Sequence, residues 1–114
     1  MWLITTRGFY SAVEHTDDPD RLLVRARCRA DLDNLADLVP GEPVYLEHAD
    51  YPWRVETTRA VWRAALAALA DEITYPNFKS AVPEPAHAQA YHEVWGVLRR
   101  LDDRHQPGGP ARTT

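Results

Sequence analysis

Three arginines stand at alternate positions in the stretch LLVRARCRA, which runs from residue 22 to residue 30. In a β-strand this spacing places Arg25 and Arg27 on one face, where guanidinium groups can pair with phosphates or carboxylates. Tyr10 of an earlier stretch and Arg54 of a later one are predicted to share that face. Arginines beside an aromatic ring on an open sheet are one way of holding single-stranded RNA, so these four residues form the first candidate site.

Acidic residues are expected close to the same arginines. Glu14, Glu47 and Glu56 lie in the neighbouring stretches, and each cross-strand ion pair would contribute about 0.2–1 kcal/mol. These pairs favour a solvated, internally neutralised face over a ligand site. The formal net charge of −4 also argues against broad, non-specific nucleic-acid binding, although it is compatible with a local basic patch.

The second candidate site combines the stretches YPNFK, Tyr75–Lys79, and YHEVW, Tyr91–Trp95. A pocket between this loop and the following helix would have Tyr75 in its wall and three polar groups: Asn77, Lys79 and His92. The alternative is that Tyr75 and Phe78 plug the space between two helices, against the aromatic rings of the second stretch. The plug is the simpler interpretation, and the pocket is the best candidate for a small-molecule site.

The histidines and the cysteine lack the partners that metal or catalytic chemistry needs. His87 and His92 lie five residues apart, whereas a metal-binding pair on a helix needs three or four. His48 and Asp50 could chelate a metal only weakly. Cys28 is predicted to be a small core residue, with its flanking arginines on the opposite face. We therefore predict no metal site and no cofactor.

No catalytic motif is found in the sequence. It has no Ser–His–Asp spacing, no nucleophile elbow, no paired-carboxylate motif and too few glycines for a phosphate-binding loop. We predict that the protein is not an enzyme.

The elements that must position these residues follow from hydrophobic spacing. Residues 2–14 are extended, with a bulge or bend expected at Arg7 and Gly8. From residue 21 to residue 28, apolar side chains at even positions alternate with Arg21, Leu23, Arg25 and Arg27, as in a half-buried strand. Further elements are predicted as a helix over 31–39, strands over 44–48 and 53–57, and a helix that Thr57 or Thr58 caps and that runs to about Ile73. An irregular connector over 74–85 and a helix from 86 to about 104 follow.

The predicted helices each carry an apolar stripe that should face a core. The members are Leu32, Leu35, Leu38 and Val39 in the first; Val61, Trp62, Ala65, Leu66, Leu69 and Ile73 in the second; and Ala90, Tyr91, Val94, Trp95, Leu98 and Leu101 in the third. The order ββαββαα indicates an α+β two-layer sandwich: an antiparallel sheet of about four strands with helices packed on one face. We expect one domain over residues 1–105 and a disordered tail over 106–114.

The composition is that of an ordinary globular protein, with 45% hydrophobic and 26% charged residues among 114. A single cysteine cannot form an internal disulfide, and no apolar run approaches the roughly 18 residues of a membrane span. We therefore expect a soluble, cytoplasmic protein without a membrane partner.

Four stretches together resemble a known family: TTRGFYSAVEH…DDPD.LLVRAR at 5–27, ADYPWRV at 49–55, YPNFK at 75–79 and YHEVW at 91–95. They are similar to a family of short hypothetical proteins from high-GC actinobacteria and their phages. No activity is established for that family, so the resemblance supplies no catalytic residues. It implies a cytoplasmic, phage-associated accessory role.

The preferred functional hypothesis is a small binding or regulatory module that acts through a protein partner or by self-association. Four tryptophans and five tyrosines are more than one small core hides, and exposed aromatics favour interfaces. Two alternatives are kept: a single-stranded nucleic-acid binder that uses the arginine-bearing sheet face, and a small-molecule binder with its pocket between the 74–85 loop and the third helix.

Overall fold

The computed structural model describes residues 1–105, so the predicted tail over 106–114 lies outside the described residues. The chain forms two compact units, Met1–Pro76 and Asn77–Thr114, and each is described by itself. The single domain expected over 1–105 stays a prediction. No helix in the described part of the chain is both long enough and apolar enough to cross a membrane.

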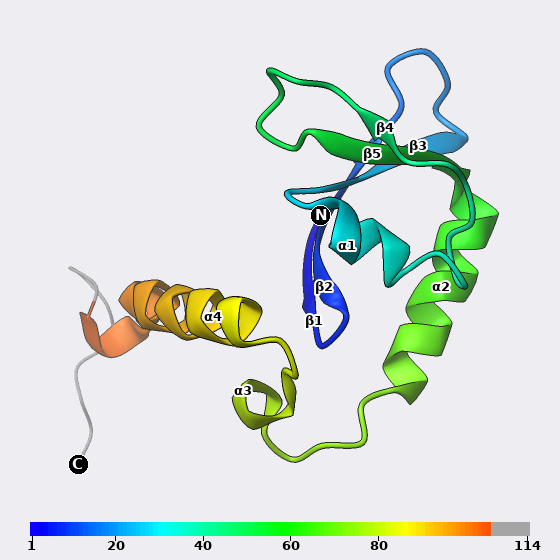
Figure 1. Cartoon of the computed structure of the whole chain (residues 1–114). Coiled ribbons are helices and arrows are strands. Elements are labelled where there is room, and N and C mark those ends of the chain that lie inside the picture. The colour runs from blue at the N-terminus through cyan, green and yellow to red at the C-terminus, as the bar shows by residue number, and fades with distance from the viewer. Residues whose placement is uncertain (106–114) are drawn as a thin grey trace. The chain divides into compact units, whose positions relative to one another are not determined.

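The first unit is an antiparallel sheet of five strands with two helices, which confirms the predicted α+β class (Figure 1). Its elements are β1 (Trp2–Thr5), β2 (Gly8–Glu14), β3 (Arg21–Ala26), α1 (Arg29–Asp33), β4 (Val44–Tyr45), β5 (Trp53–Thr58) and α2 (Arg59–Asp71). The strands lie in the order β1-β2-β3-β5-β4. The fifth strand arises because residues 2–14 fold into two strands instead of one, and the predicted strand over 44–48 shortens to two residues.

The bulge or bend predicted at Arg7 and Gly8 is a hairpin turn. Thr5 pairs with Gly8 across it, so that β1 and β2 are antiparallel neighbours. The Thr5 hydroxyl accepts hydrogen bonds from the backbone N–H groups of Arg7 and Gly8, at 3.1 and 3.2 Å, and donates to the Gly8 carbonyl at 3.0 Å. Gly8 has φ +154°, a conformation that side-chain-bearing residues rarely adopt. These local bonds stabilise a turn where the sequence pattern alone suggests a continuous strand.

The alternation along β3 is as predicted. Leu22, Val24 and Ala26 are buried at 6%, 0% and 0% exposure, whereas Arg21, Leu23 and Arg25 of the same strand are only half-buried. The buried positions join a core with residues of β2, β5 and the helices: Tyr10, Ala12, Leu32, Leu35, Val39, Val55, Trp62, Ala65 and Leu69. Helices α1 and α2 therefore cover one face of the sheet, and the arginine-bearing face lies on the other side.

Helix α1 ends earlier than the spacing predicts, at Asp33, because Asp and Asn are poor helix formers and the Asn34 side chain donates to the Arg7 carbonyl. Residues after it keep helix-like turns, with the Val39 N–H donating to the Leu35 carbonyl at 2.9 Å. Leu32, Leu35 and Val39 thus reach the core as predicted, although the regular helix is short.

Helix α2 begins where Thr58 caps it, its hydroxyl accepting from the Val61 N–H at 3.1 Å. Trp62, Ala65 and Leu69 of the predicted stripe are buried. Ile73 is not part of that stripe, because the helix ends at Asp71 and leaves its side chain 64% exposed.

Arg7 joins the β1–β2 turn to the two helical segments. Its guanidinium donates to the Glu72 carboxylate, with Nε to Oε1 at 3.0 Å, and to the Asp37 carboxylate, with Nη1 to Oδ1 at 2.6 Å. It also donates to the Asn34 carbonyl at 2.8 Å. These bonds hold the pKa values of Glu72 and Asp37 below their ordinary range.

The second unit contains α3 (Phe78–Ala81), α4 (Pro85–Leu98) and two short 3₁₀ segments, η1 (Arg99–Leu101) and η2 (Asp103–His105). Helix α3 lies in the predicted connector, where the Asn77 side chain caps it by accepting from the Ser80 N–H. Glu84 caps α4 by accepting from the N–H groups of Ala86 and His87 at 2.8 and 2.7 Å. The His87 ring and these two N–H groups lower the pKa of Glu84 to about 2.

The predicted stripe of the third helix is mostly wrong. Tyr91 is buried, but the large side chains that follow it on α4 and η1 are exposed: Val94, Trp95, Leu98 and Leu101. The regular helix ends at Leu98, where the chain tightens into 3₁₀ turns.

Candidate functional site

The sheet face opposite α1 and α2 brings three arginines together. Ser11 of β2 pairs with Arg25 of β3, and Arg25 pairs with Arg54 of β5. Directly paired residues share a face, so these three side chains form a row across the sheet. The Arg25 Nη2 donates to the Ser11 hydroxyl at 2.8 Å, and Ser11 is buried beneath it. We call this surface the arginine face; it comprises Trp2, Phe9, Ser11, Arg25, Arg27, Tyr51 and Arg54.

Tyr51 lies at the centre of the arginine face and organises its cations. The guanidinium carbons of Arg25 and Arg27 lie 4.7 and 4.5 Å from the ring centroid, within the range of cation–π contacts. Arg27 also donates to the Asp50 carbonyl at 2.7 Å, and Arg54 donates to the Tyr51 carbonyl at 3.1 Å. The loop between β4 and β5 is therefore fastened to the sheet by the same arginines that were predicted as ligand contacts.

An aromatic row continues from Tyr51 to the edge of the sheet. The Phe9 and Tyr51 ring centroids are 6.1 Å apart, and the Trp2 and Phe9 rings meet edge to face at 5.9 Å. Tyr51 is only 5% exposed, whereas Trp2 is 73% exposed. The ring available to an incoming partner is therefore that of Trp2, and Tyr51 serves as a support.

The predicted neutralisation of this face is confirmed at one end, where Glu56 pairs with Arg21, but it does not extend to the central arginines. Glu14 pairs with Arg59, and Glu56 pairs with His15 and Arg21 at one end of the sheet. The third expected partner, Glu47, lies 3.9 Å from His48.

Among the described residues, no carboxylate lies within ion-pair distance of Arg25, Arg27 or Arg54. The Nε atoms of Arg25 and Arg54 are also buried without a hydrogen-bond acceptor in this part of the chain. Buried polar groups normally have a partner, so these two N–H groups are a further unusual feature of this face. The arginine face therefore presents three positive charges that the described protein does not balance.

Tyr10 does not belong to the arginine face. The hairpin turn shifts the alternation of β2 by one residue relative to the prediction, so that Phe9, Ser11 and Val13 face the arginines. Tyr10 lies on the helix side, fully buried, and its hydroxyl donates to the Asp31 carbonyl at 2.6 Å. It is a core residue, as Ala12 is.

The residues of the second candidate site have separate structural roles. Within the second unit, the Lys79 ammonium lies 4.0 Å from the Trp95 ring centroid, and the His92 ring stacks on the same indole at 5.7 Å. Asn77 is occupied as the cap of α3, and Phe78 stacks on Tyr91 at 5.7 Å, which is one contact of the predicted plug; the plug as a whole stays a prediction. These contacts fix Lys79 and His92 around one indole ring.

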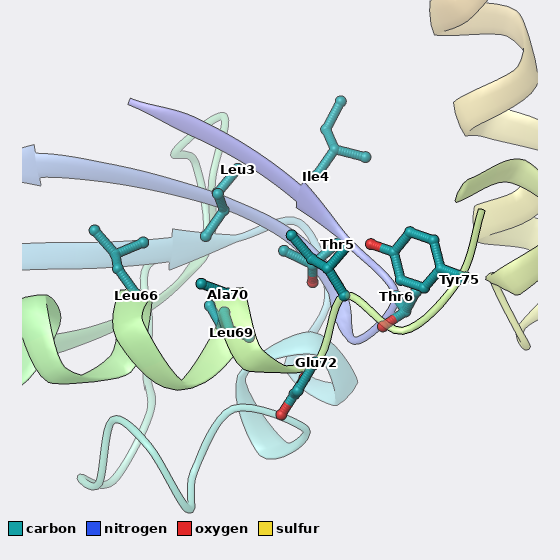
Figure 2. Close-up of a pocket in the computed structure, with 10 residues that line it drawn as sticks. Leu3, Ile4, Thr5, Thr6, Leu66, Leu69, Ala70, Glu72 and Tyr75 are labelled. Atoms are coloured by element: carbon teal, nitrogen blue, oxygen red, sulfur yellow. The ribbon is translucent and has the colours of Figure 1, made fainter. Parts of the chain in front are cut away.

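Tyr75 lies near the end of the first unit and lines a pocket of about 270 Å³ (Figure 2). The other walls come from β1 and its turn and from the last turns of α2: Leu3, Ile4, Thr5, Thr6, Leu66, Leu69, Ala70, Glu72 and Ile73. This lining is mostly apolar, and the pocket lies on the helix side of the sheet, away from the arginine face.

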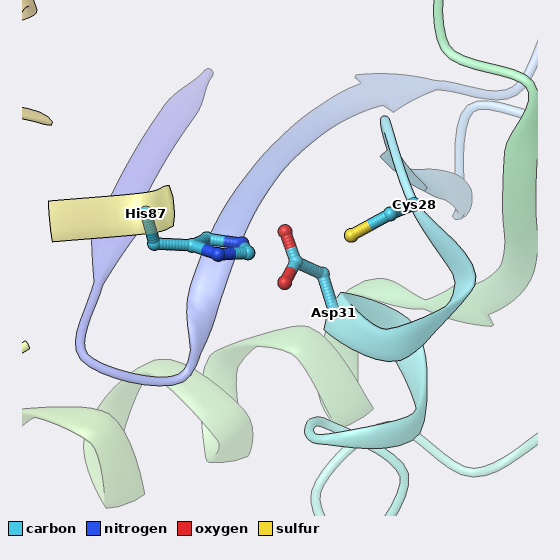
Figure 3. A group of neighbouring side chains, drawn as sticks. All are labelled: Cys28, Asp31 and His87. Carbon is cyan, nitrogen blue, oxygen red and sulfur yellow. The ribbon is translucent and has the colours of Figure 1, made fainter. Parts of the chain in front are cut away.

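Cys28 and Asp31 lie side by side at the start of α1, where Figure 3 shows the thiol next to the carboxylate. Burial raises the pKa of the Cys28 thiol, and the negative charge of Asp31 adds to that shift. The Asp31 carboxylate is buried and accepts from the Phe9 N–H at 3.1 Å. A thiol with a raised pKa is a poor nucleophile, so this pair favours a structural role.

Sequence reasoning missed four members of the arginine face: Trp2, Phe9, Ser11 and Tyr51. The alternation of β2 could have been assigned from the turn, because Thr5 and Gly8 bracket a two-residue connection. Tyr51 follows Asp50, whose carboxylate accepts from the Tyr51 N–H at 2.9 Å, a local bond that is common in turns. No sequence signal shows that its ring folds back between two arginines.

No family model matches the chain, and no curated protein or solved structure shows significant similarity to it. The likeness to short proteins of actinobacteria and their phages stays a prediction. The function is therefore inferred from the chemistry of the arginine face.

Proposed function

We propose that this protein is a cytoplasmic binding module that acts through a protein partner, and that the partner contacts the arginine face with a carboxylate-bearing segment. The observation that carries this proposal is the absence of any carboxylate, among the described residues, beside Arg25, Arg27 and Arg54. The free thiol of Cys28 suits a reducing compartment.

The types of residue on this face are those that contribute most to protein interfaces. Arginine, tryptophan and tyrosine dominate the strongly contributing residues found by alanine scanning. Trp2 offers an exposed ring, and Arg27 is an exposed cation whose position is fixed by the Tyr51 ring and the Asp50 carbonyl. A guanidinium that is already ordered loses less conformational entropy when it binds a carboxylate.

A protein segment fits this chemistry better than a long polyanion. The chain carries a net charge of −4, and an ion pair between Arg21 and Glu56 closes one end of the sheet face. A polyanion that extended beyond the three arginines would approach the rest of a chain with net negative charge, whereas a short acidic segment would not. Apolar side chains next to the arginines, Leu23 and Val13 among them, also suit a partner with mixed polar and apolar groups.

Affinity capture from cells of the source organism tests the proposal. The immobilised wild-type protein is compared with Arg27→Ala and with Arg63→Ala, which removes an exposed arginine from α2 on the opposite side of the sheet. A true partner is captured equally by wild type and Arg63→Ala, and the amount captured falls by about tenfold or more with Arg27→Ala. Nuclease treatment does not reduce its capture. Equal recovery of every captured protein with all three immobilised variants contradicts the proposal.

Single-stranded nucleic acid on the same face is the second candidate, favoured by the exposed Trp2 ring, on which a base could stack. Fluorescence anisotropy with a labelled oligouridylate tests it. Three arginine–phosphate contacts predict that log K falls with log salt concentration with a slope of about −2. Binding with that slope, lost in Arg27→Ala and kept in Arg63→Ala, would replace the protein partner as the conclusion. Flat anisotropy at low salt removes this candidate.

A further inference from the structure

The outer edge of β1 has hydrogen-bonding groups without partners in the described chain. Met1 and Ala12 exchange both backbone bonds, the Met1 amino group donating to the Ala12 carbonyl and the Ala12 N–H donating to the Met1 carbonyl, each at 2.9 Å. In an antiparallel pair such bonded positions alternate with unbonded ones. Trp2 and Ile4 are therefore the positions whose N–H and C=O groups point away from β2, and β1 pairs with no other described strand.

This edge lacks the features that normally prevent strand addition. Exposed edges usually carry lysine, proline or a bulge. From Trp2 to Thr6 the sequence is WLITT, which is uncharged, free of proline and paired with β2 in regular register. The exposed side chains next to it are large and apolar: Met1 at 63%, Trp2 at 73% and Ile73 at 64% exposure.

The apolar pocket of Figure 2 lies against the same strand. Leu3 and Thr5 of β1 line it on one side, and Leu66, Leu69 and Ala70 of α2 line it on the other. A strand added to the free edge of β1 would have every second side chain on the helix side of the sheet, next to this space.

We propose that β1 pairs with β1 of a second copy, antiparallel, about a two-fold axis at Leu3. In this register Trp2 of each copy bonds to Ile4 of the other, so that all the outward N–H and C=O groups of both residues are paired. Leu3 faces Leu3 of the second copy on the helix side. Trp2 belongs to both surfaces, but this proposal depends on the backbone edge of β1 and does not rest on the proposed function.

A second copy suits the edge because the edge is complementary to itself. Its own sequence supplies an uncharged strand, and its own Leu3 and Met1 are the apolar side chains that the register carries toward the pocket beside Thr5 and Ile73. On the opposite side of the sheet, Trp2 meets Ile4 of the second copy, an aromatic–β-branched pair of the kind that stabilises antiparallel sheets. A two-fold interface requires this self-complementarity.

The dimer is one continuous ten-stranded sheet, with all the α1 and α2 helices on one side and both arginine faces on the other. The shared edge is short, so the buried area lies at the low end of the range for specific protein–protein interfaces. We expect a dissociation constant of about 10–100 µM for the dimer.

Sedimentation equilibrium across about 1–500 µM tests the association. Wild type is expected to pass from the monomer mass of 13.0 kDa to twice that mass. Trp2→Lys places a charge on the edge and is expected to abolish the dimer. Val44→Lys places the same charge on β4, at the other edge of the sheet, on a side chain that is 61% exposed, and is expected to leave the dimer unchanged. A monomer at all concentrations, or a dimer that survives Trp2→Lys, overturns the proposal.

A disulfide test checks the register without depending on affinity. In a Cys28→Ser background, Leu3→Cys places its thiol opposite its own copy in an unbonded antiparallel pair, where Cα atoms are about 4.5 Å apart, within disulfide range. Mild oxidation is expected to give a covalent dimer on a non-reducing gel. In Trp2→Cys the new thiol lies opposite Ile4 of the other copy, so this variant is expected to form no covalent dimer on the gel. The reverse result, or cross-linking of neither variant under conditions where the wild-type mass doubles, rejects the register.

Discussion

Replacing Gly8 by alanine should strongly destabilise the first unit, because this position meets a buried carboxylate. A Cβ atom at Gly8 would lie 2.5 Å from both Cγ and Oδ1 of Asp31 and 2.9 Å from its Cβ, closer than such atoms approach in real proteins. Asp31 would have to move and give up the hydrogen bond that its other oxygen accepts from the Phe9 N–H at 3.1 Å.

Two effects combine in this substitution. The backbone at Gly8, with φ +154°, costs alanine about 1–3 kcal/mol of strain. The loss of a hydrogen bond to a buried charged group costs about 1.5–3 kcal/mol more. We therefore expect Gly8→Ala to lower the free energy of unfolding by about 2.5–6 kcal/mol, a large fraction of the total for a protein of this size.

Urea unfolding followed by circular dichroism measures this loss, and a double-mutant cycle with Asp31→Gly separates the two effects. With the Asp31 side chain gone, Gly8→Ala should cost only the backbone strain, so the coupling free energy should be about 1.5–3 kcal/mol. Gly96→Ala is the control, since a Cβ on that helical residue meets no atom within 4 Å and should stabilise α4 by up to about 1 kcal/mol. Additive effects of Gly8→Ala and Asp31→Gly would refute the steric argument.

Three further predictions concern other contacts of the first unit. Arg7→Met should reduce stability above about pH 5, because Arg7 keeps the pKa values of Glu72 and Asp37 below their ordinary values of 4.5 and 3.8. A carboxyl group with a lowered pKa in the folded state stabilises that state above its ordinary pKa. This contribution is lost as the pH falls through the lowered pKa. The difference in urea midpoint between wild type and Arg7→Met should therefore shrink toward pH 3, and a constant difference would count against this reasoning. Cys28 should react with iodoacetamide more slowly at pH 8 than a cysteine in an unstructured peptide, and Asp31→Asn should speed that reaction because it removes a negative charge that raises the thiol pKa. Tyr51→Leu should lower the stability measured in thermal unfolding by about 1–3 kcal/mol, because it removes two cation–π contacts and the burial of the ring. Tyr51→Phe keeps the ring and should stay within about 0.5 kcal/mol of wild type. Equal losses in both variants would show that the ring is not the stabilising element.

The sequence pattern predicts the layers of the first unit because burial has a clear period there. Leu22, Val24 and Ala26 alternate with half-buried positions, and Trp62, Ala65 and Leu69 recur at helical spacing, so each element has one apolar face to cover. These residues occupy the core as the alternation requires.

The pattern fails where local hydrogen bonds decide the course of the chain. Thr5 closes a hairpin within a run that reads as one strand, and the resulting shift moves Tyr10 into the core. The third helix fails for a different reason: its apolar spacing is correct, but Val94 and Leu98 find no core within the second unit. Apolar spacing predicts that a helix face is buried, but it does not indicate which part of the protein covers that face.

The arginine face was predicted in part. Arg25 and Arg54 do lie side by side across β3 and β5, as alternation alone requires. The choice of ion-pair partners depends on exact register, which sets Glu56 opposite Leu23 and within reach of Arg21 instead of the central arginines. Register comes from turn geometry and from contacts distant in sequence, and a single sequence read by period contains neither.

The strand order has a consequence for the time course of folding. β1, β2 and β3 follow one another as a meander with short turns, whereas β3 pairs with β5 only after the chain between Ala26 and Trp53 has closed into a loop. That loop is longer than either hairpin turn and costs more entropy to close, so we expect the meander to form early and β5 to dock late. Arg54 and Tyr51 reach their native positions only when β5 docks, so the arginine face is complete only in fully folded molecules. A nascent or partly unfolded chain would have no complete arginine face, so the binding proposed for that face should report on the native population.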